Sequence, residues 1–244
     1  MKFLSPAKLN LNLRVISKRK GDYHNLETTF QLINLFDEIS FEESDKSFGI
    51  SCDGLDIEPE NNLIFKSLNA ITKHCNVNKG IQIHLKKIIP AGAGLGGGSS
   101  NAATTLIALN KIWDLNLSTE ELVDIGKGLG ADVPIFIYGK NAVATGIGDV
   151  LSDIELKKNK YLLICPNIEV STSEMFGKLK IHELDPKHQN SFLDTLLKEH
   201  KSIEDFYKSF VNDYDLKLSG TGSTLFIKYD KKDELEKILQ KIPK

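Results

Sequence analysis

Long apolar runs are missing from the sequence: no stretch of its 244 residues approaches the length of a membrane-spanning helix. The three cysteines, Cys52, Cys75 and Cys165, lie far apart without a C-x-x-C pair, which argues against a disulfide framework. The six histidines form no H-x3-H ladder and no cluster with cysteine, so the sequence predicts no structural metal site. The segment MKFLSPAKLNLN lacks the features of a signal or transit peptide, and we expect a cytoplasmic protein.

An excess of charge of either sign is also missing. Lysine and arginine together number 31, and aspartate and glutamate 33, for a formal net charge of −2. This balance gives no electrostatic footprint for nucleic acid or for an anionic membrane surface. Hydrophobic residues make up 41% of the chain, which is ordinary for a globular protein with a sizeable core. We therefore expect neither nucleic acid nor a membrane as a partner.

Glycine is concentrated in the stretch PAGAGLGGGSS at residues 90–100, which contains no charged residue. The preceding segment, IQIHLKKII at 81–89, alternates apolar and polar residues at first and predicts a strand. The following segment, NAATTLIALNKIW at 101–113, has apolar residues at helical spacing. A glycine loop between a strand and the N-terminus of a helix presents backbone N–H groups to an anion. The sequence therefore predicts a phosphate-binding loop rather than a flexible linker.

Two other glycine-rich phosphate motifs fit this loop less well. Gly92-x-Gly94-x-x-Gly97 satisfies the dinucleotide fingerprint formally, but the acidic residue required about 20 residues later, at a strand end, would fall at the end of a helix. A Walker P-loop needs a lysine where this chain has Gly98. A dinucleotide-binding fold is therefore disfavoured, and a kinase built on this loop must draw its positive charge from elsewhere.

The rest of the sequence mixes helices and strands without regular βαβ alternation, which favours an α+β fold. The segment KLNLNLRV at 8–15 has a period of two and places Lys8 and Asn10 side by side on the polar face of a strand. Pro134 predicts extended backbone, followed by an apolar strand, IFIY, at 135–138.

A charged run, KKNK at 157–160, precedes an apolar segment, YLLICP at 161–166, where the strand pattern begins again. Helical patterns follow around 189–210 and at the end of the chain. We therefore predict two domains, residues 1–152 and residues 153–244.

Four ordered motifs point to a family. They are PAKLNL at 6–11, PAGAGLGGGSSNAA at 90–103, LGADVP at 129–134 and SGTGS at 219–223. Together they closely resemble the motifs of the GHMP kinases, which include the galactose, homoserine, mevalonate and phosphomevalonate kinases. The form GGGSSNAA resembles in particular the branch of that family that phosphorylates a cytidine diphosphate ester of methylerythritol. The motifs span nearly the whole chain, so the resemblance does not depend on one loop.

The resemblance implies a two-domain α+β GHMP kinase fold with the active site in the interdomain cleft. The N-terminal domain would be ribosomal-protein-S5-domain-2-like and would bind ATP, and the C-terminal domain would be a ferredoxin-like α/β sandwich. The implied reaction is ATP-dependent phosphorylation of the 2-hydroxyl of 4-diphosphocytidyl-2-C-methyl-D-erythritol, in the non-mevalonate isoprenoid pathway. The partner is then a small-molecule substrate, the cofactors are ATP and Mg²⁺, and we expect a monomer or weak homodimer.

By motif, the resemblance assigns catalysis to Lys8 and Asp132. The Asp132 carboxylate would accept the proton of the attacking hydroxyl, and the Lys8 cation would favour the ionised aspartate and the developing alkoxide. Taken singly, Lys8 could equally be a solvated strand lysine, and Asp132 a turn aspartate between a helix and the strand at 135–138. Joined to the glycine loop by order and motif, the two residues favour the catalytic interpretation.

The glycine loop would bind the phosphates of ATP through its backbone amides, and the dipole of the helix beginning at Asn101 would add to the attraction. The predicted ATP-binding residues are Pro90, Ala91, Gly92, Ala93, Gly94, Leu95, Gly96, Gly97, Gly98, Ser99, Ser100 and Asn62. Ser99 and Ser100 are also suited to capping that helix. Phosphate oxygens and water would supply most Mg²⁺ ligands, together with one serine hydroxyl, and no protein carboxylate is assigned to the metal.

The resemblance also implies contacts to the substrate. The predicted substrate-binding residues are Asn10, Tyr23, His24, Thr172, Phe176, Gly220, Thr221 and Gly222. Tyr23 and His24 match the branch's pair assigned to cytosine, and Phe176 aligns with an aromatic residue that stacks on the base, although it is equally suited to a core. Thr172 would contact the diphosphate or erythritol end, and the segment 220–222 would close over the transferred phosphate.

Two other functions stay open at this point. One is a GHMP kinase that acts on a different small alcohol, and the other is a non-enzymatic module that binds ATP or a dinucleotide. An intact pair of Lys8 and Asp132 within hydrogen-bonding reach of a bound substrate hydroxyl would speak against the second.

Overall fold

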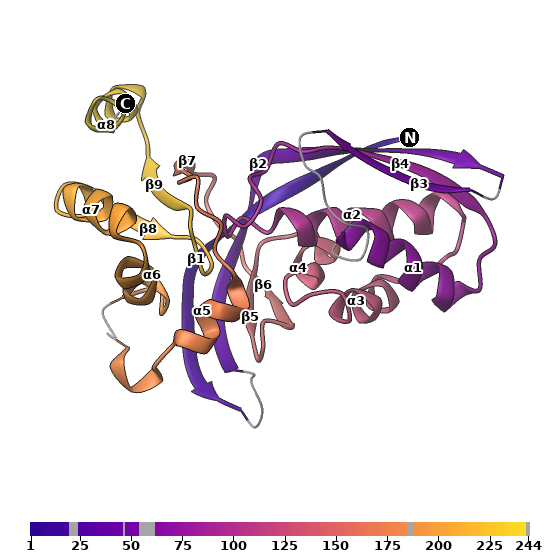
Figure 1. Ribbon diagram of the computed structural model, residues 1–244, viewed down its shortest axis with the longest axis horizontal. Helices are drawn as coiled ribbons and strands as arrows, with labels where there is room; N and C mark the ends of the chain where they lie inside the picture. The colour runs from indigo at the N-terminus through magenta and orange to yellow at the C-terminus, as the bar shows by residue number, and fades with distance from the viewer. Residues whose placement is uncertain (20–23, 46, 54–61, 185–187, 243–244) are drawn as a thin grey trace.

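The structure, a computed structural model, describes residues 1–19, 24–45, 47–53, 62–184 and 188–242. Two sheets and the helices packed on them form two regions of this chain, and two long strands, β1 and β2, run from one region towards the other (Figure 1). Helices and strands are mixed without repeating βαβ units, which confirms the predicted α+β class. Among the described residues, no helix combines the length and apolarity that crossing a membrane would require.

The first sheet has six strands in the order β3-β4-β2-β5-β6, with β1 paired to β2 off this path. The strands are β1 (Lys2–Lys18), β2 (His24–Ser44), β3 (Phe48–Asp53), β4 (Gly80–Lys86), β5 (Ala142–Thr145) and β6 (Val150–Asp153). β2 pairs antiparallel with β1, β4 and β5, whereas β3 runs parallel to β4. The strands predicted at 8–15 and around 81–85 are confirmed as parts of β1 and β4.

Helices α1 to α4 pack together on one side of the first sheet (Figure 1). Their bounds are α1 (Leu63–Cys75), α2 (Gly97–Ile112), α3 (Thr119–Lys127) and α4 (Val133–Tyr138). α2 is the central helix, since it contacts the other three helices as well as β1 and β2. The glycine loop therefore leads from β4 into the most enclosed helix of this region.

The strand predicted at 135–138 is wrong, because these residues belong to the helix α4. Pro134 stands in the first turn of α4, where a missing N–H costs nothing, since the first amides of a helix have no intrahelical acceptor. All residues from 133 to 137 are buried, so the segment carries no helical periodicity that a sequence pattern could reveal. Asp132 consequently lies between two helices, α3 and α4, and not between a helix and a strand.

The second sheet has three antiparallel strands in the order β7-β9-β8. They are β7 (Lys160–Ile164), β8 (Leu216–Leu218) and β9 (Leu225–Tyr229). The helices of this region are α5 (Thr172–Lys178), α6 (Leu193–Glu199), α7 (Lys201–Phe210) and α8 (Lys232–Lys241), with a 3-10 turn at Ile181–Glu183. α5 lies between this sheet and the far ends of β1 and β2 (Figure 1).

β1 contributes to the cores of both regions. Leu13 and Val15 are buried in a cluster with Phe192 and other residues of the second region. Ala7 and Leu9 are buried in a smaller cluster that includes Phe226 of β9. The predicted boundary after residue 152 falls inside β6, before its last residue, and the division into two domains stays a prediction.

Candidate active site

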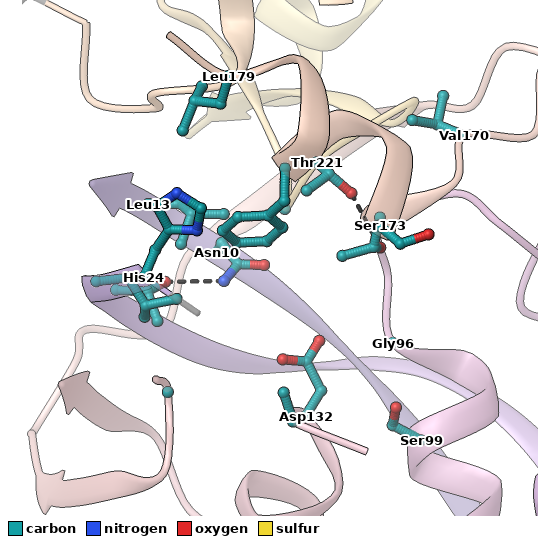
Figure 2. A pocket seen from close by; sticks show the side chains of 18 of the residues that line it. Asn10, Leu13, His24, Gly96, Ser99, Asp132, Val170, Ser173, Leu179 and Thr221 are labelled. Carbon is teal, nitrogen blue, oxygen red and sulfur yellow. Dashed lines mark hydrogen bonds between the residues drawn. The ribbon is translucent and has the colours of Figure 1, made fainter. Parts of the chain in front are cut away.

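A cavity of about 1230 Å³ is lined by residues of both regions. Its walls come from β1 and β2, from the glycine loop, from the turn before α4, from the segment around α5 and from the loop after β8. Figure 2 shows Asp132 and Ser99 on one side of this cavity, His24 and Leu13 on another, and Val170 and Ser173 on the side of α5. Segments that are far apart in the sequence thus meet around one space.

Lys8 and Asp132 form an ion pair in this cavity, with 3.3 Å between Lys8 Nζ and Asp132 Oδ2. The lysine side chain is only 3% exposed, so the interpretation of Lys8 as a solvated strand lysine is wrong. Its ammonium also donates to the carbonyl of Gly94 at 2.9 Å and to the side-chain oxygen of Asn10. The Asp132 side chain is 36% exposed and points into the cavity (Figure 2). A buried cation persists only with such partners, and here they hold it beside an accessible carboxylate.

Asn10 fixes the direction of the Lys8 ammonium. The Asn10 side-chain NH₂ donates to the hydroxyl of Thr28 at 2.8 Å (Figure 2), and that hydroxyl donates in turn to the carbonyl of Asn12 at 2.6 Å. Because the amide nitrogen donates to Thr28, the amide oxygen faces Lys8 and accepts a hydrogen bond from its ammonium. Asn10 is buried and lines the cavity, and its predicted contact with the substrate stays a prediction.

The glycine loop turns its backbone amides away from the protein. All four carbonyls of residues 92–95 accept hydrogen bonds of 2.9–3.2 Å from the protein. The Gly92 carbonyl accepts from Val170 N–H, and the Ala93 carbonyl accepts from Thr224 N–H. The Gly94 carbonyl accepts from both the Ser219 hydroxyl and the Lys8 ammonium, and the Leu95 carbonyl accepts from Lys8 N–H. The C=O and N–H of a trans peptide point to opposite sides, so the N–H groups of residues 93–96 point away from these donors. None of the described residues accepts a hydrogen bond from these four N–H groups. The loop therefore presents a row of unused donors, which is the arrangement that binds phosphate.

Glycine is required in this loop for conformation and for space. Gly94 has a φ of +75°, in the left-handed region that other residues rarely adopt. A Cβ at this position would lie 2.4 Å from the carbonyl oxygen of Ser219 and 2.7 Å from that of Gly222. The glycine loop and the segment 219–222 therefore pack backbone against backbone, which brings two of the four motifs into contact.

The N-terminus of α2 borders the cavity beside the glycine loop. Gly96 is the N-cap of this helix and offers no side chain to accept from the first-turn amides. The first turn contains no acidic residue, so the positive end of the helix dipole is not neutralised there. Gly97, Gly98 and Ser99 of this turn line the cavity.

The far end of the cavity carries aromatic rings. The centroids of the His24 and Phe176 rings are 5.3 Å apart with planes tilted by 31°, and Phe176 also packs edge-on against Phe192 at 4.7 Å. Thr172 and Thr221 meet nearby, with their hydroxyl oxygens 3.2 Å apart. Phe176 thus serves the core and the cavity wall together, and the two interpretations of this residue are not exclusive.

Comparisons with known proteins decide the family. Residues 62–140 match the model of the GHMP kinases N terminal domain. The chain is 38% identical to 4-diphosphocytidyl-2-C-methyl-D-erythritol kinase of Haemophilus ducreyi, over 96% of this chain and 87% of that one. It is 40% identical to the kinase of the same name from Syntrophus aciditrophicus, over 99% of this chain and 95% of that one. The chain belongs to the 4-diphosphocytidyl-2-C-methyl-D-erythritol kinase family.

Solved structures agree with this membership. A crystal structure of 4-(cytidine 5'-diphospho)-2C-methyl-D-erythritol kinase matches the chain with a TM-score of 0.85 at 26% identity, over 98% of this chain and 94% of that one. A mevalonate kinase, at 15% identity and with a TM-score of 0.74, shares the fold. The GHMP kinase fold implied by the four motifs is therefore confirmed.

Most residues that this kinase family's motifs singled out line the cavity. Those that do are Lys8, Asn10, His24, Pro90, Ala91, Gly92, Ala93, Gly94, Gly96, Gly97, Gly98, Ser99, Asp132, Thr172, Phe176, Gly220 and Thr221. Four others do not: Leu95, Ser100, Asn62 and Gly222. Tyr23 lies outside the described residues. Asn62 caps α1 by accepting from Ile64 N–H at 2.9 Å, so its predicted ATP contact stays a prediction.

Sequence reasoning missed three basic side chains that line the cavity, Lys18, Lys180 and His182. The last two follow α5 in the run LKIH at 179–182, where apolar and basic residues alternate. This alternation was the available signal, but nothing local shows that the basic residues face a cavity. Across the described residues, no group of three or more His, Cys, Asp or Glu side chains could hold a metal ion.

Proposed function

We propose that this chain phosphorylates the 2-hydroxyl of 4-diphosphocytidyl-2-C-methyl-D-erythritol with ATP, a step of the non-mevalonate isoprenoid pathway. The name of its relatives supports the substrate. One observation carries the chemistry: Ala93, Gly94 and Gly96, whose amides are unused, line the same cavity as the Lys8–Asp132 pair. A loop for phosphate next to a carboxylate for a hydroxyl proton is the arrangement that phosphoryl transfer to an alcohol requires.

In this proposal Asp132 is the general base. Its carboxylate accepts the proton of the 2-hydroxyl as the hydroxyl oxygen attacks the γ-phosphorus of ATP, and the bond from that phosphorus to the β–γ bridging oxygen breaks to release ADP. Lys8, held 3.3 Å from the carboxylate, stabilises negative charge on the attacking oxygen and the transferring phosphoryl group. Asn10 keeps the ammonium in place through the reaction.

ATP fits the glycine loop because the loop offers what a triphosphate needs, namely backbone donors and a positive helix end. The Lys8 ammonium supplies the cation that a Walker lysine would supply in a P-loop. Mg²⁺ neutralises the phosphate charge when bound, and phosphate oxygens and water supply most of its ligands. Ser99 is the serine whose hydroxyl would hold the metal, because Ser99 lines the cavity beside the loop whereas Ser100 does not.

The cytidine end of the substrate lies at His24 and Phe176 in this proposal. Inserting a base between two rings requires roughly twice the carbon contact distance of about 3.5–4.0 Å, so the 5.3 Å between these centroids is too short. The base therefore stacks on the cavity side of this ring pair. Tyr23, the other residue predicted to contact cytosine, lies outside the described residues. Thr172, Gly220 and Thr221 face the diphosphate and erythritol portion, where Lys18 and Lys180 add positive charge.

The remaining features of the proposal concern the whole chain. The chain itself supplies every residue assigned to the site, so a monomer suffices, and a weak homodimer is compatible with it. The reaction takes place in the cytoplasm, where ATP is available.

The test is ADP release by the purified chain with Mg-ATP and one of four alcohols: the cytidine-diphosphate-methylerythritol ester, mevalonate, homoserine or galactose. We expect turnover only with the cytidylated alcohol. Turnover with another alcohol would retain the kinase and reject the substrate. A folded sample that binds ATP and phosphorylates none of the four would favour a nucleotide-binding module instead.

A further inference from the structure

Asp37 is a fully buried carboxylate of β2 that does not line the cavity. Taking an ionised carboxylate out of water is strongly unfavourable unless hydrogen-bond donors surround it. Four donors do so here: the Lys87 ammonium, the backbone N–H groups of Ile88 and Ile89, and the side-chain NH₂ of Asn101. The catalytic scheme above uses none of these groups.

These donors stand at the two ends of the glycine loop. Ile88 and Ile89 come directly before residues 90–100, and their N–H groups donate to Asp37 Oδ1 at 2.7 and 2.8 Å. Asn101 comes directly after the loop, and its Nδ2 donates to Asp37 Oδ2 at 2.9 Å. One carboxylate therefore holds the entry and the exit of the loop together.

The same network reaches the strand that carries the catalytic lysine. The Asn101 side chain also donates to the Ser5 hydroxyl at 3.0 Å, and that hydroxyl donates to Ser100 Oγ at 2.8 Å. Ser5 stands opposite Asp37 in the β1–β2 ladder, three residues before Lys8. We call Asp37, Asn101, Ser5 and Ser100 the loop clasp. It connects the loop ends to β1 through side chains that are all buried.

We propose that Asp37, acting with Asn101, is a positioning residue that sets the separation of the loop ends and thereby the direction of the amides of residues 93–96. The inference rests on the proposed kinase function, in which these amides bind the phosphates of ATP. Neither side chain lines the cavity, so both act through the loop. A displacement of reacting groups by about 1 Å costs on the order of 100-fold in rate. A small shift of the loop, caused by a change in the clasp outside the cavity, would therefore lower the rate strongly.

The test compares two asparagines of the same helix. Asn101 lies in the first turns of α2 and belongs to the clasp, whereas Asn110 lies near its other end, donates to the Leu117 carbonyl and accepts from Leu117 N–H, both at 3.0 Å. Each of Asn101→Ala and Asn110→Ala removes side-chain hydrogen bonds from α2. The thermal midpoint of each variant, its dissociation constant for Mg-ATP by calorimetry without alcohol, and kcat and KM for both substrates are measured.

We expect Asn101→Ala to raise the dissociation constant and KM for Mg-ATP about tenfold or more, as for loss of a hydrogen bond to a charged group. The KM for the alcohol should change by less than about twofold, because the loop does not bind it. Asn110→Ala should lower the thermal midpoint and leave Mg-ATP affinity at the wild-type value. Asn101→Asp, which sets a second carboxylate against Asp37, should weaken Mg-ATP binding more than Asn101→Ala does.

Two results would contradict the proposed role of the clasp in Mg-ATP binding. Wild-type affinity for Mg-ATP in both Asn101 variants, alongside a lowered thermal midpoint, would make the network merely structural while leaving the proposed function intact. Wild-type protein that binds no Mg-ATP and transfers no phosphate would overturn the proposed function and the clasp together. Asp37→Asn adds a direct test when it folds, and the Asn101 variants decide the question when it does not.

Discussion

At the scale of single residues, Asp132 combines exposure with a strong partner. Its carboxylate reaches the cavity, and the Lys8 ammonium beside it is buried and keeps further acceptors in Asn10 and Gly94. Replacing the carboxylate by an amide retains an oxygen that faces the lysine, so the fold should tolerate the change. What disappears is the ability to accept a proton from the substrate.

Asp132→Asn should therefore reduce kcat by about 10²- to 10⁴-fold, the usual contribution of a general base. The dissociation constant for Mg-ATP should stay close to the wild-type value, because the loop amides are unchanged. Steady-state kinetics and calorimetry measure the two quantities. Asp124→Asn is the matched control, since Asp124 is exposed on α3, pairs with Lys127 and lies away from the cavity. Near-normal turnover by Asp132→Asn would remove Asp132 from the role of base.

Phe176 is a residue with two functions, and a second phenylalanine separates them. Phe176→Ala removes a stacking surface worth about 1–3 kcal/mol per base, so KM for the cytidylated substrate should rise far more than kcat falls. Phe206→Ala removes a ring from the same hydrophobic cluster, where it stacks on Phe210 outside the cavity. Both variants should lower the thermal midpoint, but only Phe176→Ala should change KM. An unchanged KM in Phe176→Ala would assign this ring to the core alone.

At the scale of elements, the glycine loop and the segment 219–222 act as one unit. Gly94→Ala places a Cβ 2.4 Å from the Ser219 carbonyl oxygen and forces a left-handed conformation that costs roughly 1–2 kcal/mol for an L-residue. We expect the two segments to separate and Mg-ATP affinity to fall at least tenfold. Gly128→Ala is the control, because Gly128 has a φ of −71° and a Cβ there meets its nearest atom at 3.4 Å. Equal Mg-ATP affinities in the two variants would contradict this account of the loop.

The sequence could predict an element only where the residues of that element carry a recognisable pattern themselves. The loop at 90–100 and the strand at 8–15 carry their signals in spacing alone, and both were predicted. The helix α4 was missed, because full burial of 133–137 leaves no polar face to define a period. The pairing of Lys8 with Asp132 was predicted only from the family motifs. The burial of Lys8 was not predicted, since a strand lysine beside Asn10 looks solvated from its spacing.

The loop clasp shows the other limit of sequence reasoning. Asp37 is separated from Ile88 and Ile89 by about fifty positions along the chain and from Asn101 by 64. Nothing near Asp37 in the sequence distinguishes it from an ordinary strand-end aspartate. Its partners become visible only when the β1–β2 pairing and the path of the loop are known.

At the scale of the whole molecule, the two sheets are not independent. Leu13 of β1 exchanges backbone hydrogen bonds with the second region, donating to the Gln189 carbonyl and accepting from Ser191 N–H, both at 2.8 Å. The Leu13 and Val15 side chains are each only 6% exposed, in the cluster that contains Phe192. Removing β1 would therefore open the core of the second region.

The isolated fragment 153–244 should consequently fail to form a cooperative fold. Burial of one Leu or Val side chain contributes about 1.5–3 kcal/mol, and a whole domain is stable by only about 5–15 kcal/mol, so losing two such side chains and their backbone partners is a large fraction. Near-UV circular dichroism and amide chemical-shift dispersion of the fragment test this expectation. The intact chain should unfold in one transition, and Leu13→Ala should lower the midpoint of that transition without splitting it. A fragment with native-like dispersion and its own sharp transition would show instead that the boundary at residue 152 separates two autonomous domains, and the contacts of β1 would then serve the cavity rather than the stability of the second region.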